Sequence, residues 1–340
     1  MAQTAKKNTA GREGTSIAEA YPHRLDAVVL AGTHRNPSRL IGGRNKALLE
    51  VAGKSLVRHV VDALGRARTI DRIFVVGPVE QIRAALGEAA SAVDLIEQRG
   101  KMLTNSWAGI RAAEARHQDQ PGLPVADRPL LVISCDLPLV TGPAIDDFVC
   151  RCARLDRESE SPAAMMVGVV DEPGVAPFHP AGGKPGIKRP FVELASGRLR
   201  LANIYVGRPR KLAHQEFLQT GFSYRKARDW RNVVCLAWSF FRRPHGWQSA
   251  WLTMRIQLTL MLSKGKGRLY RYLKAGNTLA RVEKCMSEIL GGPVRIVLTP
   301  FGGLSLDVDE EEDYRVLKRC YADWSAITQS VRTHTEACPD

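Results

Sequence analysis

The sequence predicts an α/β protein: a three-layer, doubly wound, mostly parallel sheet with a helical, basic segment inserted late in the chain. Short apolar runs of strand length recur up to about residue 155, each followed by a loop and an amphipathic stretch with helical spacing. Such units close by right-handed crossovers and place ligands beyond the carboxyl ends of the strands. From about His214 to Leu290 helical spacing dominates instead.

The first predicted strand, Asp26–Ala31, has the length and β-branched content of a buried parallel strand. Gly32 ends it, and the following loop carries further glycines and the cations Arg39 and Lys46. Glycine lets backbone N–H groups approach an anion, and Lys and Arg neutralise it, so this loop is a candidate phosphate site. A merely basic surface loop explains the same residues equally well.

The remaining elements follow in order along the chain. Further strands are predicted over residues 72–77, 93–96, 130–134, 165–170, 191–194, 201–206 and 294–298, with helices over 55–64, 79–90 and 108–115 between the earlier ones. The opening loop, the loop 99–105 and Asp136 all follow strands, so we expect them at one edge of the sheet.

We divide the chain into a disordered leader (1–22), an α/β domain (23–212), a mainly helical basic insertion (213–290), a return to the α/β domain (291–325) and a tail (326–340). The seven cysteines show no CxxC pair or metal-ligand spacing, which favours reduced thiols. No signal peptide and no run of about 18 apolar residues is present, so we expect a cytoplasmic protein.

The positive charge is concentrated in one segment. The chain carries a formal net charge of +14. Between Lys184 and Lys274 there are 20 Lys and Arg residues against three acidic residues, a net charge of +17, so the rest of the chain is slightly acidic. This segment therefore favours an anionic partner.

Two acidic features are candidate metal ligands. Asp136 follows the most hydrophobic strand, where a carboxylate can bind a divalent ion; capping of the next helix is the alternative. The run Asp307–Asp313 follows an apolar stretch and precedes a helix. On its own, this run is better explained by favourable interaction with the helix N-terminus.

One apolar run in the basic segment has two interpretations. Trp251–Leu262 is too short to span a bilayer and contains Arg255. A core helix is the favoured interpretation. The alternative is an interfacial helix that contacts an anionic membrane beside the cations Arg242, Arg243, Lys264, Lys266 and Arg268.

Taken together, an ordered set of motifs resembles the molybdenum-cofactor-guanylyltransferase-like nucleotidyltransferases, which have a glycosyltransferase-A-like NTP transferase domain. The motifs are Leu30-Ala31-Gly32, Arg39-Leu40, Lys46-Ala47-Leu48, Gly53-Lys54-Ser55-Leu56, Ser134-Cys135-Asp136-Leu137-Pro138 and Leu306–Asp313. Thr33 and Asn45 stand where the family usually has glycine and proline, and residues 34–37 lengthen the loop. The nearest likeness is to an uncharacterised branch with a basic insertion.

The resemblance implies transfer of a nucleoside monophosphate from a nucleoside triphosphate to a phosphorylated small-molecule or lipid-linked acceptor, with release of pyrophosphate. It implies catalytic roles for Lys46 and Arg39, and nucleotide binding by Leu30, Ala31, Gly32, Thr33, Lys46, Asn105 and Asp136, with the backbone N–H groups of Ala31 and Gly32 near base or phosphate. Mg²⁺ would be held by Asp136 and by Asp309 or Asp307, and the acceptor by Lys184, Lys188, Arg189 and Asn203.

Two other classes of function compete with this one. A sugar-nucleotide-dependent glycosyltransferase of the same architecture expects a D-x-D motif near the middle of the sheet, whereas Asp307–Asp309 lies near the C-terminus. A non-catalytic binder of an anionic membrane or nucleic acid is suggested by the pI of about 9.7. No zinc spacing or RNA-recognition signature is present, so no nucleic-acid partner is expected, while peripheral binding at the inner face of a membrane stays open.

Overall fold

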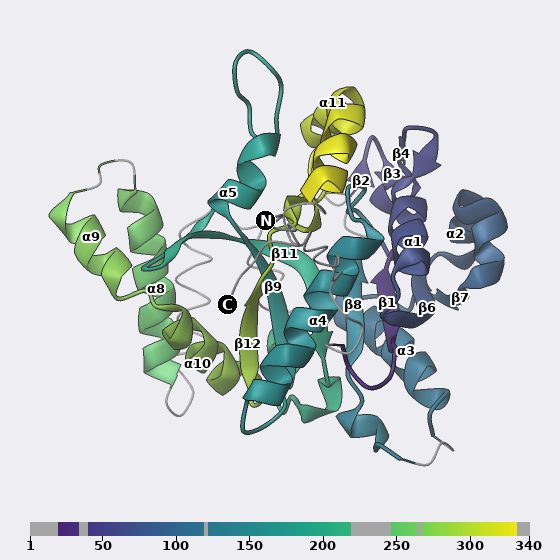
Figure 1. Cartoon of the computed structure of the whole chain (residues 1–340), viewed down its shortest axis with the longest axis horizontal. Coiled ribbons are helices and arrows are strands. Elements are labelled where there is room, and N and C mark those ends of the chain that lie inside the picture. Colours follow the sequence, from purple (N-terminus) through teal and green to yellow (C-terminus); the bar gives the residue numbers. More distant parts are fainter. Residues whose placement is uncertain are drawn as a thin grey trace, which may run out of the picture.

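The computed structural model of the protein describes residues 20–33, 40–118, 122–218, 246–263, 265 and 267–331. Within them, eight strands form one mixed sheet flanked by helices (Figure 1). The strand order is β12–β9–β11–β8–β1–β6–β7, and β10 pairs with β11 outside this order. The predicted α/β fold class is confirmed. Arg39 and nearly all of the predicted leader lie outside the described residues.

The strands of the main sheet are β1 (Leu25–Leu30), β6 (Ile70–Gly77), β7 (Asp94–Glu97), β8 (Leu130–Ser134), β9 (Met165–Asp171), β10 (Val192–Leu194), β11 (Gly197–Gly207) and β12 (Val294–Leu298). Two small hairpins are formed by β2 (Leu40–Ile41) with β3 (Arg44–Asn45) and by β4 (Glu50–Val51) with β5 (Lys54–Ser55).

The α-helices are α1 (Leu56–Arg66), α2 (Val79–Leu86), α3 (Met102–Ala115), α4 (Gly142–Glu158), α5 (Glu172–Val175), α8 (Gly246–Leu262), α9 (Arg268–Ala275), α10 (Leu279–Leu290) and α11 (Glu311–Ser330). Short 3₁₀ turns are η3 (Lys46–Leu48), η4 (Gly87–Ala92), η5 (Val125–Asp127), η6 (Ala176–Phe178), η7 (Pro209–Lys211) and η8 (Gly302–Ser305). Helix α3 begins six residues before the predicted start, and α11 continues past residue 325, where the sequence placed the end of the domain.

Successive residues of β1 pack into different cores on the two faces of the sheet. The sheet and the helices on each of its faces form the three layers. Ala27 and Val29 pack in the larger core with α1, α2 and α4, whereas Val28 packs in a second core with α3. Strand β1 lies between β6 and β8 and is parallel to both. A parallel strand buried on both faces is hydrophobic throughout, which is why the run 26–31 could be recognised from the sequence.

The sheet gathers the carboxyl ends of β1 and β8 at one edge. β12 runs parallel to β9, and the chain then passes through η8 toward the residues that follow β8. The amide of Val308 donates to the carbonyl of Asp136 at 3.3 Å, which holds the two segments together. Residues far apart in sequence thus meet where the doubly wound fold places ligands.

Helices α8, α9 and α10 form a group beside β10 and β12 (Figure 1). The expectation that Trp251–Leu262 is a core helix is wrong: among the α8 side chains that the structure describes, only Thr259 is buried. In the described part of the chain, α8 contacts α9, α10 and β10. No helix in the described part of the chain is long and apolar enough to cross a bilayer.

Candidate functional site

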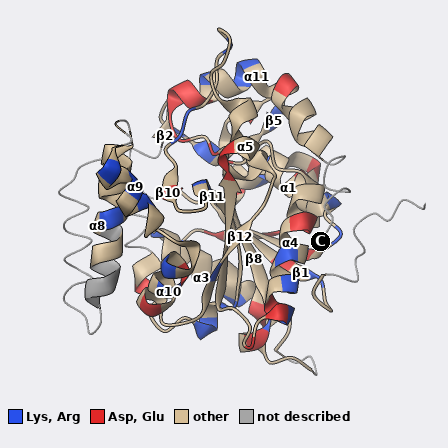
Figure 2. Cartoon of the chain, turned by 60° about the vertical axis from the view of Figure 1, so that its left-hand side comes forward, with Lys and Arg blue, Asp and Glu red and all other residues tan. Residues whose placement is uncertain are grey.

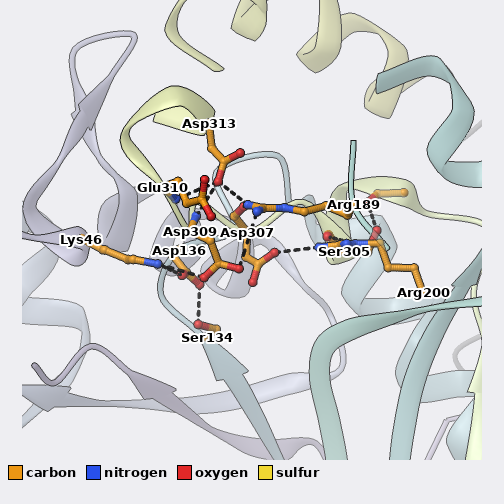
Figure 3. A network of polar contacts seen from close by, with 11 residues as sticks. Lys46, Ser134, Asp136, Arg189, Arg200, Ser305, Asp307, Asp309, Glu310 and Asp313 are labelled. Atoms are coloured by element: carbon orange, nitrogen blue, oxygen red, sulfur yellow. Dashed lines mark hydrogen bonds and ion pairs between the residues drawn. The ribbon is translucent and has the colours of Figure 1, made fainter. Parts of the chain in front are cut away.

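Three carboxylates meet at the carboxyl edge of the sheet (Figure 3). Asp136 follows β8, while Asp307 and Asp309 lie between η8 and α11. Each offers one carboxylate oxygen, and these oxygens lie within 4.8 Å of one another. Asp136 does not cap the next helix, because that position belongs to Thr141. The three candidate metal ligands predicted from the sequence are thus close enough to share one ion.

The side chain of Lys46 enters this group of acids. Its Nζ lies 3.1 Å from Oδ1 of Asp309 and 3.8 Å from Oδ2 of Asp136, and the side chain is only 11% exposed. The buried side chain of Asn45 positions it: Nδ2 donates to the carbonyl of Ala31, and Oδ1 accepts from the amide of Ala47. Asn45 thus caps η3 and ties Lys46 to the end of β1.

Gly42 and Gly43, shortly before Lys46, form a tight turn. Gly42 and Gly43 connect β2 to β3 and have φ values of 56° and 73°. Two consecutive residues in this left-handed region are what a tight two-residue hairpin requires. The sequence interpretation that these glycines admit an anion is therefore not needed to explain them. The hairpin instead directs the chain from residue 40 back toward Lys46.

Two arginines, one of them unforeseen, hold the acidic segment in place. Arg200, on β11, donates from Nη2 to Oδ1 of Asp307 at 2.9 Å and from Nε to the carbonyl of Ser305 at 2.7 Å. Arg189 donates from Nη2 to the carbonyl of Asp307 at 2.9 Å and pairs with Asp313. Both guanidinium groups are largely buried, so the ion pairs are shielded from water.

The segment Asp307–Asp313 both begins helix α11 and contains candidate metal ligands, the two roles considered from the sequence. Glu310 and Asp313 form a capping box at the start of α11, and Asp313 also accepts from the amide of Asp309 at 3.0 Å. Helix initiation therefore fixes the backbone that carries Asp307 and Asp309. The helix interpretation and the metal interpretation are compatible, because different carboxylates take the two roles.

Opposing effects act on the pKa of Asp136. Burial raises the pKa of Asp136, and the charges of Asp307 and Asp309 raise it further, whereas Lys46 and a hydrogen bond from Ser134 lower it. The pKa stays above its usual range because burial is the largest of these effects. A cation bound beside Asp136 relieves the same burial penalty, so this position favours a positively charged ligand.

The donor set fits a hard divalent cation. Carboxylate oxygens are the ligands that Mg²⁺ takes in proteins, and the structure places three of them together. They are not equivalent: the side chain of Asp307 is 4% exposed and paired with Arg200, whereas that of Asp309 is 23% exposed and meets Lys46. Asp136 and Asp309 are therefore better placed to hold an ion than Asp307.

A second group of predicted residues meets beside the end of β1. A Cβ on Gly32 would lie 2.6 Å from Nδ2 of Asn105, so only glycine permits this approach. Asn105 in turn accepts from the amide of Arg99 at 2.8 Å and braces the loop before α3. Gln98, which the sequence did not single out, accepts from the amide of Thr33 at 2.9 Å.

The amide of Ala31, by contrast, donates to the carbonyl of Val76 at 2.8 Å, as part of the pairing of β1 with β6. This N–H group is therefore already engaged, and its nearness to the nucleotide stays a prediction. Its carbonyl is also engaged, by Asn45. The side chain of Leu30 lines an apolar cleft of about 100 Å³ with Met102 and Trp107, on the side of the sheet that α3 covers.

The four predicted acceptor-binding residues differ in their exposure and surroundings. Lys184 and Lys188 are exposed, whereas Asn203 is buried on β11. Arg189 points into the acidic group, where burial lowers its pKa but Asp307 and Asp313 outweigh this and raise it. An arginine held by carboxylates is already neutralised, so its assignment to the acceptor stays a prediction.

The ion pair between Arg200 and Asp307 should be needed for stability. We expect Arg200→Met to lower the free energy of unfolding by roughly 3 kcal/mol, because removal of one partner leaves a buried charge uncompensated. Arg72→Met is the matched control, since the pair of Arg72 with Asp94 is largely exposed and should cost under about 1 kcal/mol. Denaturant unfolding measures both; equal losses would contradict this role for Arg200.

Comparisons with known proteins bear on the fold and the family of the chain. Over 154 residues the chain is 30% identical to the bifunctional protein GlmU of Sorangium cellulosum (strain So ce56). The match covers 45% of this chain and 30% of GlmU, so the chain spans under a third of that relative's length. A hypothetical transferase from Thermus thermophilus superposes with a TM-score of 0.54 at 24% identity, covering 85% of this chain and 99% of that one; this likeness shows the fold.

The family comparison covers more than half of the chain. Residues 27–213 match the MobA-like NTP transferase domain. This span includes the end of β1, Lys46, Asn105, Asp136 and Arg189, whereas Asp307 and Asp309 lie beyond it. The matched span thus holds the opening loop and the strand before Asp136. The chain belongs to the family of MobA-like NTP transferase domains.

Proposed function

We propose that the protein is a Mg²⁺-dependent nucleotidyltransferase that moves a nucleoside monophosphate from a nucleoside triphosphate to a phosphorylated acceptor and releases pyrophosphate. The observation that carries the proposal is the meeting of Lys46 with Asp136 and Asp309 at the carboxyl edge of the sheet, inside a chain of the NTP transferase family. One lysine and two acids at this place combine a phosphate-binding charge with candidate metal ligands.

Charge balance gives Lys46 its proposed role. In the structure four carboxylates (Asp136, Asp307, Asp309 and Asp313) are grouped with three cations (Lys46, Arg189 and Arg200). With Lys46 in place, the group keeps one excess negative charge when no nucleotide is bound. When a triphosphate enters, Lys46 turns toward it and leaves two excess negative charges, which match one divalent ion.

The reaction needs positioning and charge stabilisation more than a protein nucleophile. Lys46 would stabilise the charge that develops on the α-phosphate and on the departing pyrophosphate. Gly32 and Asn105 would receive the base or ribose, because they meet beside the same strand end. Lys184 and Lys188, exposed on the loop before Arg189, would attract the acceptor's phosphate.

Asp136 and Asp309 would hold the metal ion, with Asp307 behind them. A bound Mg²⁺ supplies positive charge that screens the phosphate oxygens and orients them for in-line attack. The protein's own part is the fixed backbone: Val308 bonded to Asp136 and the capping box of α11 keep the two ligands at one place. Arg200 pairs with Asp307 and so compensates a charge within a buried setting.

The position of the D-x-D motif in the sequence does not exclude the glycosyltransferase alternative, so this alternative has to be tested. The sequence argument placed the D-x-D motif far from the middle of the sheet, but the fold returns Asp307 and Asp309 to the end of the central strand β8. The family match still favours a nucleoside triphosphate over a sugar nucleotide.

The test is a panel of the four nucleoside triphosphates against phosphorylated acceptors, with pyrophosphate release as the readout. GTP is tried first because of the resemblance to the molybdenum-cofactor guanylyltransferases. We expect release to require a divalent cation and to rise with one acceptor. Turnover of a sugar nucleotide, with no pyrophosphate from any triphosphate, would overturn the proposal and favour the glycosyltransferase.

A further inference from the structure

Exposed apolar side chains in this protein are concentrated on two helices. Of ten large hydrophobic residues that are exposed in the described part of the chain, seven lie on α8 and α9: Trp251, Leu258, Leu260, Met261, Leu262, Leu269 and Tyr272. Met261 and Tyr272 are 73% and 72% exposed. Monomeric soluble proteins seldom group such residues unless they mark an interaction surface.

The same segment is rich in positive charge. From Gly246 to Val282 the sequence has seven Lys and Arg residues and no Asp or Glu. Figure 2 shows the blue of Lys and Arg on α8 and α9. Arg268 and Arg271 are exposed on α9, on the same short helix as Leu269 and Tyr272. Apolar and cationic side chains therefore alternate along one helix without any acid to balance them.

These side chains form one surface because Arg255 joins the two helices. Its guanidinium donates to the carbonyls of Tyr272 and Leu273 at 2.9 Å and lies 5.6 Å from the centre of the Tyr272 ring. Trp251 and Leu258 lie one turn before and after Arg255 on the same side of α8. We call the α8–α9 surface the residues Trp251, Leu258, Met261, Leu262, Leu269 and Tyr272, with Arg268 and Arg271. Leu260 is left out because, two residues after Leu258, it lies on the opposite side of α8.

Glycine at position 276 leaves room for this junction. A Cβ there would lie 1.8 Å from Nη2 of Arg255, so another residue would displace the end of the arginine side chain. The arginine noticed inside the apolar run therefore has a structural role at the C-terminal end of α9. It also keeps the ring of Tyr272 beside α8.

The α8–α9 surface is firmly attached to the α/β domain. Glu193 on β10 is buried and accepts from the Tyr270 hydroxyl at 3.1 Å, and its carboxylate lies 3.4 Å from Nζ of Lys274. Asn277 donates both to the carbonyl of Glu193 and to Thr259 on α8. These contacts hold α8 and α9 to the strand that begins four residues after Lys188, a predicted acceptor-binding residue.

We propose that the α8–α9 surface docks on an anionic lipid bilayer, lying in its interface rather than crossing it. Aromatic rings and long aliphatic chains enter the boundary between headgroups and acyl chains, while Arg268 and Arg271 meet anionic headgroups. A nucleic acid is a poorer fit, because exposed Leu and Met side chains gain little from contact with phosphates. The proposal goes beyond the proposed function and does not depend on it.

The experiment is flotation of the full-length protein with vesicles, without nucleotide or metal. Vesicles of phosphatidylcholine with phosphatidylglycerol are compared with vesicles of phosphatidylcholine alone. We expect binding to the anionic vesicles at least about tenfold stronger at low salt, with a steep loss as salt is raised. Equal binding to both vesicles, or to neither, overturns the proposal.

Two double variants separate the apolar and electrostatic contributions. Met261→Ser with Tyr272→Ser and Arg268→Glu with Arg271→Glu should each weaken binding to anionic vesicles by about tenfold or more. Leu123→Ser and Arg83→Glu are the matched controls, since both residues are exposed elsewhere, and should leave binding unchanged. Unaltered thermal unfolding shows that each variant folds.

Other occupants of the surface give distinct results. Vesicle binding that the two double variants leave intact would place the lipid contact elsewhere and refute the proposal. Binding to duplex DNA or RNA without binding to vesicles would assign the surface to nucleic acid. Self-association in gel filtration that the Met261→Ser and Tyr272→Ser changes abolish, with no vesicle binding, would assign it to a second copy of the chain.

Discussion

Asp136→Asn should reduce pyrophosphate release by roughly 10³-fold or more, because it removes a carboxylate from the three that meet at the end of β8. Asparagine has nearly the same shape and can still bond to Ser134, so the buried site keeps its packing. The measurement is kcat/KM for pyrophosphate release at saturating Mg²⁺. Added Mn²⁺ should restore only a small part of the activity, because asparagine lacks the negative charge with which Asp136 would bind the metal ion.

Asp26→Asn is the matched control. Asp26 is also a buried carboxylate on β1 and is paired with Arg116 and His117, but it lies near the opposite end of the strand from the acidic group. We expect this variant to lose stability and to keep the turnover of its folded fraction. Full activity in Asp136→Asn, or an equal loss of turnover in both variants, would refute the metal assignment.

Lys46→Met should have opposite effects on turnover and on metal binding. Turnover should fall by roughly 10²-fold or more, because no ammonium then stabilises the triphosphate's developing charge. Without nucleotide, however, Mn²⁺ should bind about tenfold more tightly, since the Lys46 ammonium no longer competes for Asp309 and Asp136. Isothermal titration and steady-state kinetics on the same preparation measure the two effects.

Lys54→Met controls for the loss of a lysine near the same loop. Lys54 lies on β5 and pairs with Asp62 on the surface, so neither metal affinity nor turnover should change beyond about twofold. Weaker Mn²⁺ binding in Lys46→Met would mean that the lysine does not occupy the cation's place. The charge-balance argument for its movement would then be wrong.

The sequence revealed the strands and Asp136 because parallel strands buried on both faces are continuous apolar runs. Asp136 could be singled out because it is a carboxylate directly after the most hydrophobic of these runs. The sequence also identifies Asp307 and Asp309 as candidate metal ligands, but it does not distinguish between them. The difference arises because Arg200 pairs with Asp307 and buries it. Pairing with a residue on β11 is a long-range contact that no local pattern contains.

Long-range contacts also decide the surroundings of Arg189 and of Trp251–Leu262. The role of Arg189 at the acceptor stays a prediction, and no local pattern indicates that Asp313 and Asp307 hold it, because their positions depend on the start of α11. Trp251–Leu262 was expected in the core because its composition is apolar. Composition does not say how much of a helix is covered, and among the α8 side chains that the structure describes only Thr259 is buried.

Some residues were missed because their roles depend on neighbours distant in sequence. Asn45 looked like a departure from the family pattern, but its side chain joins η3 to the end of β1. Gln98 gave no local signal, although it bonds to the amide of Thr33 across the sheet edge. In both cases a polar side chain satisfies backbone groups where an apolar strand ends.

The central claim is that bond cleavage occurs between the α- and β-phosphates of a nucleoside triphosphate held by Lys46, Asp136 and Asp309. The most direct measurement follows phosphorus labels placed separately at the α and γ positions, with Mg²⁺ and the acceptor found by the panel. We predict that the α label enters the acceptor product and the γ label appears in pyrophosphate. Transfer of the γ label to the acceptor, or release of it as inorganic phosphate while the α label stays with the nucleotide, would contradict the account.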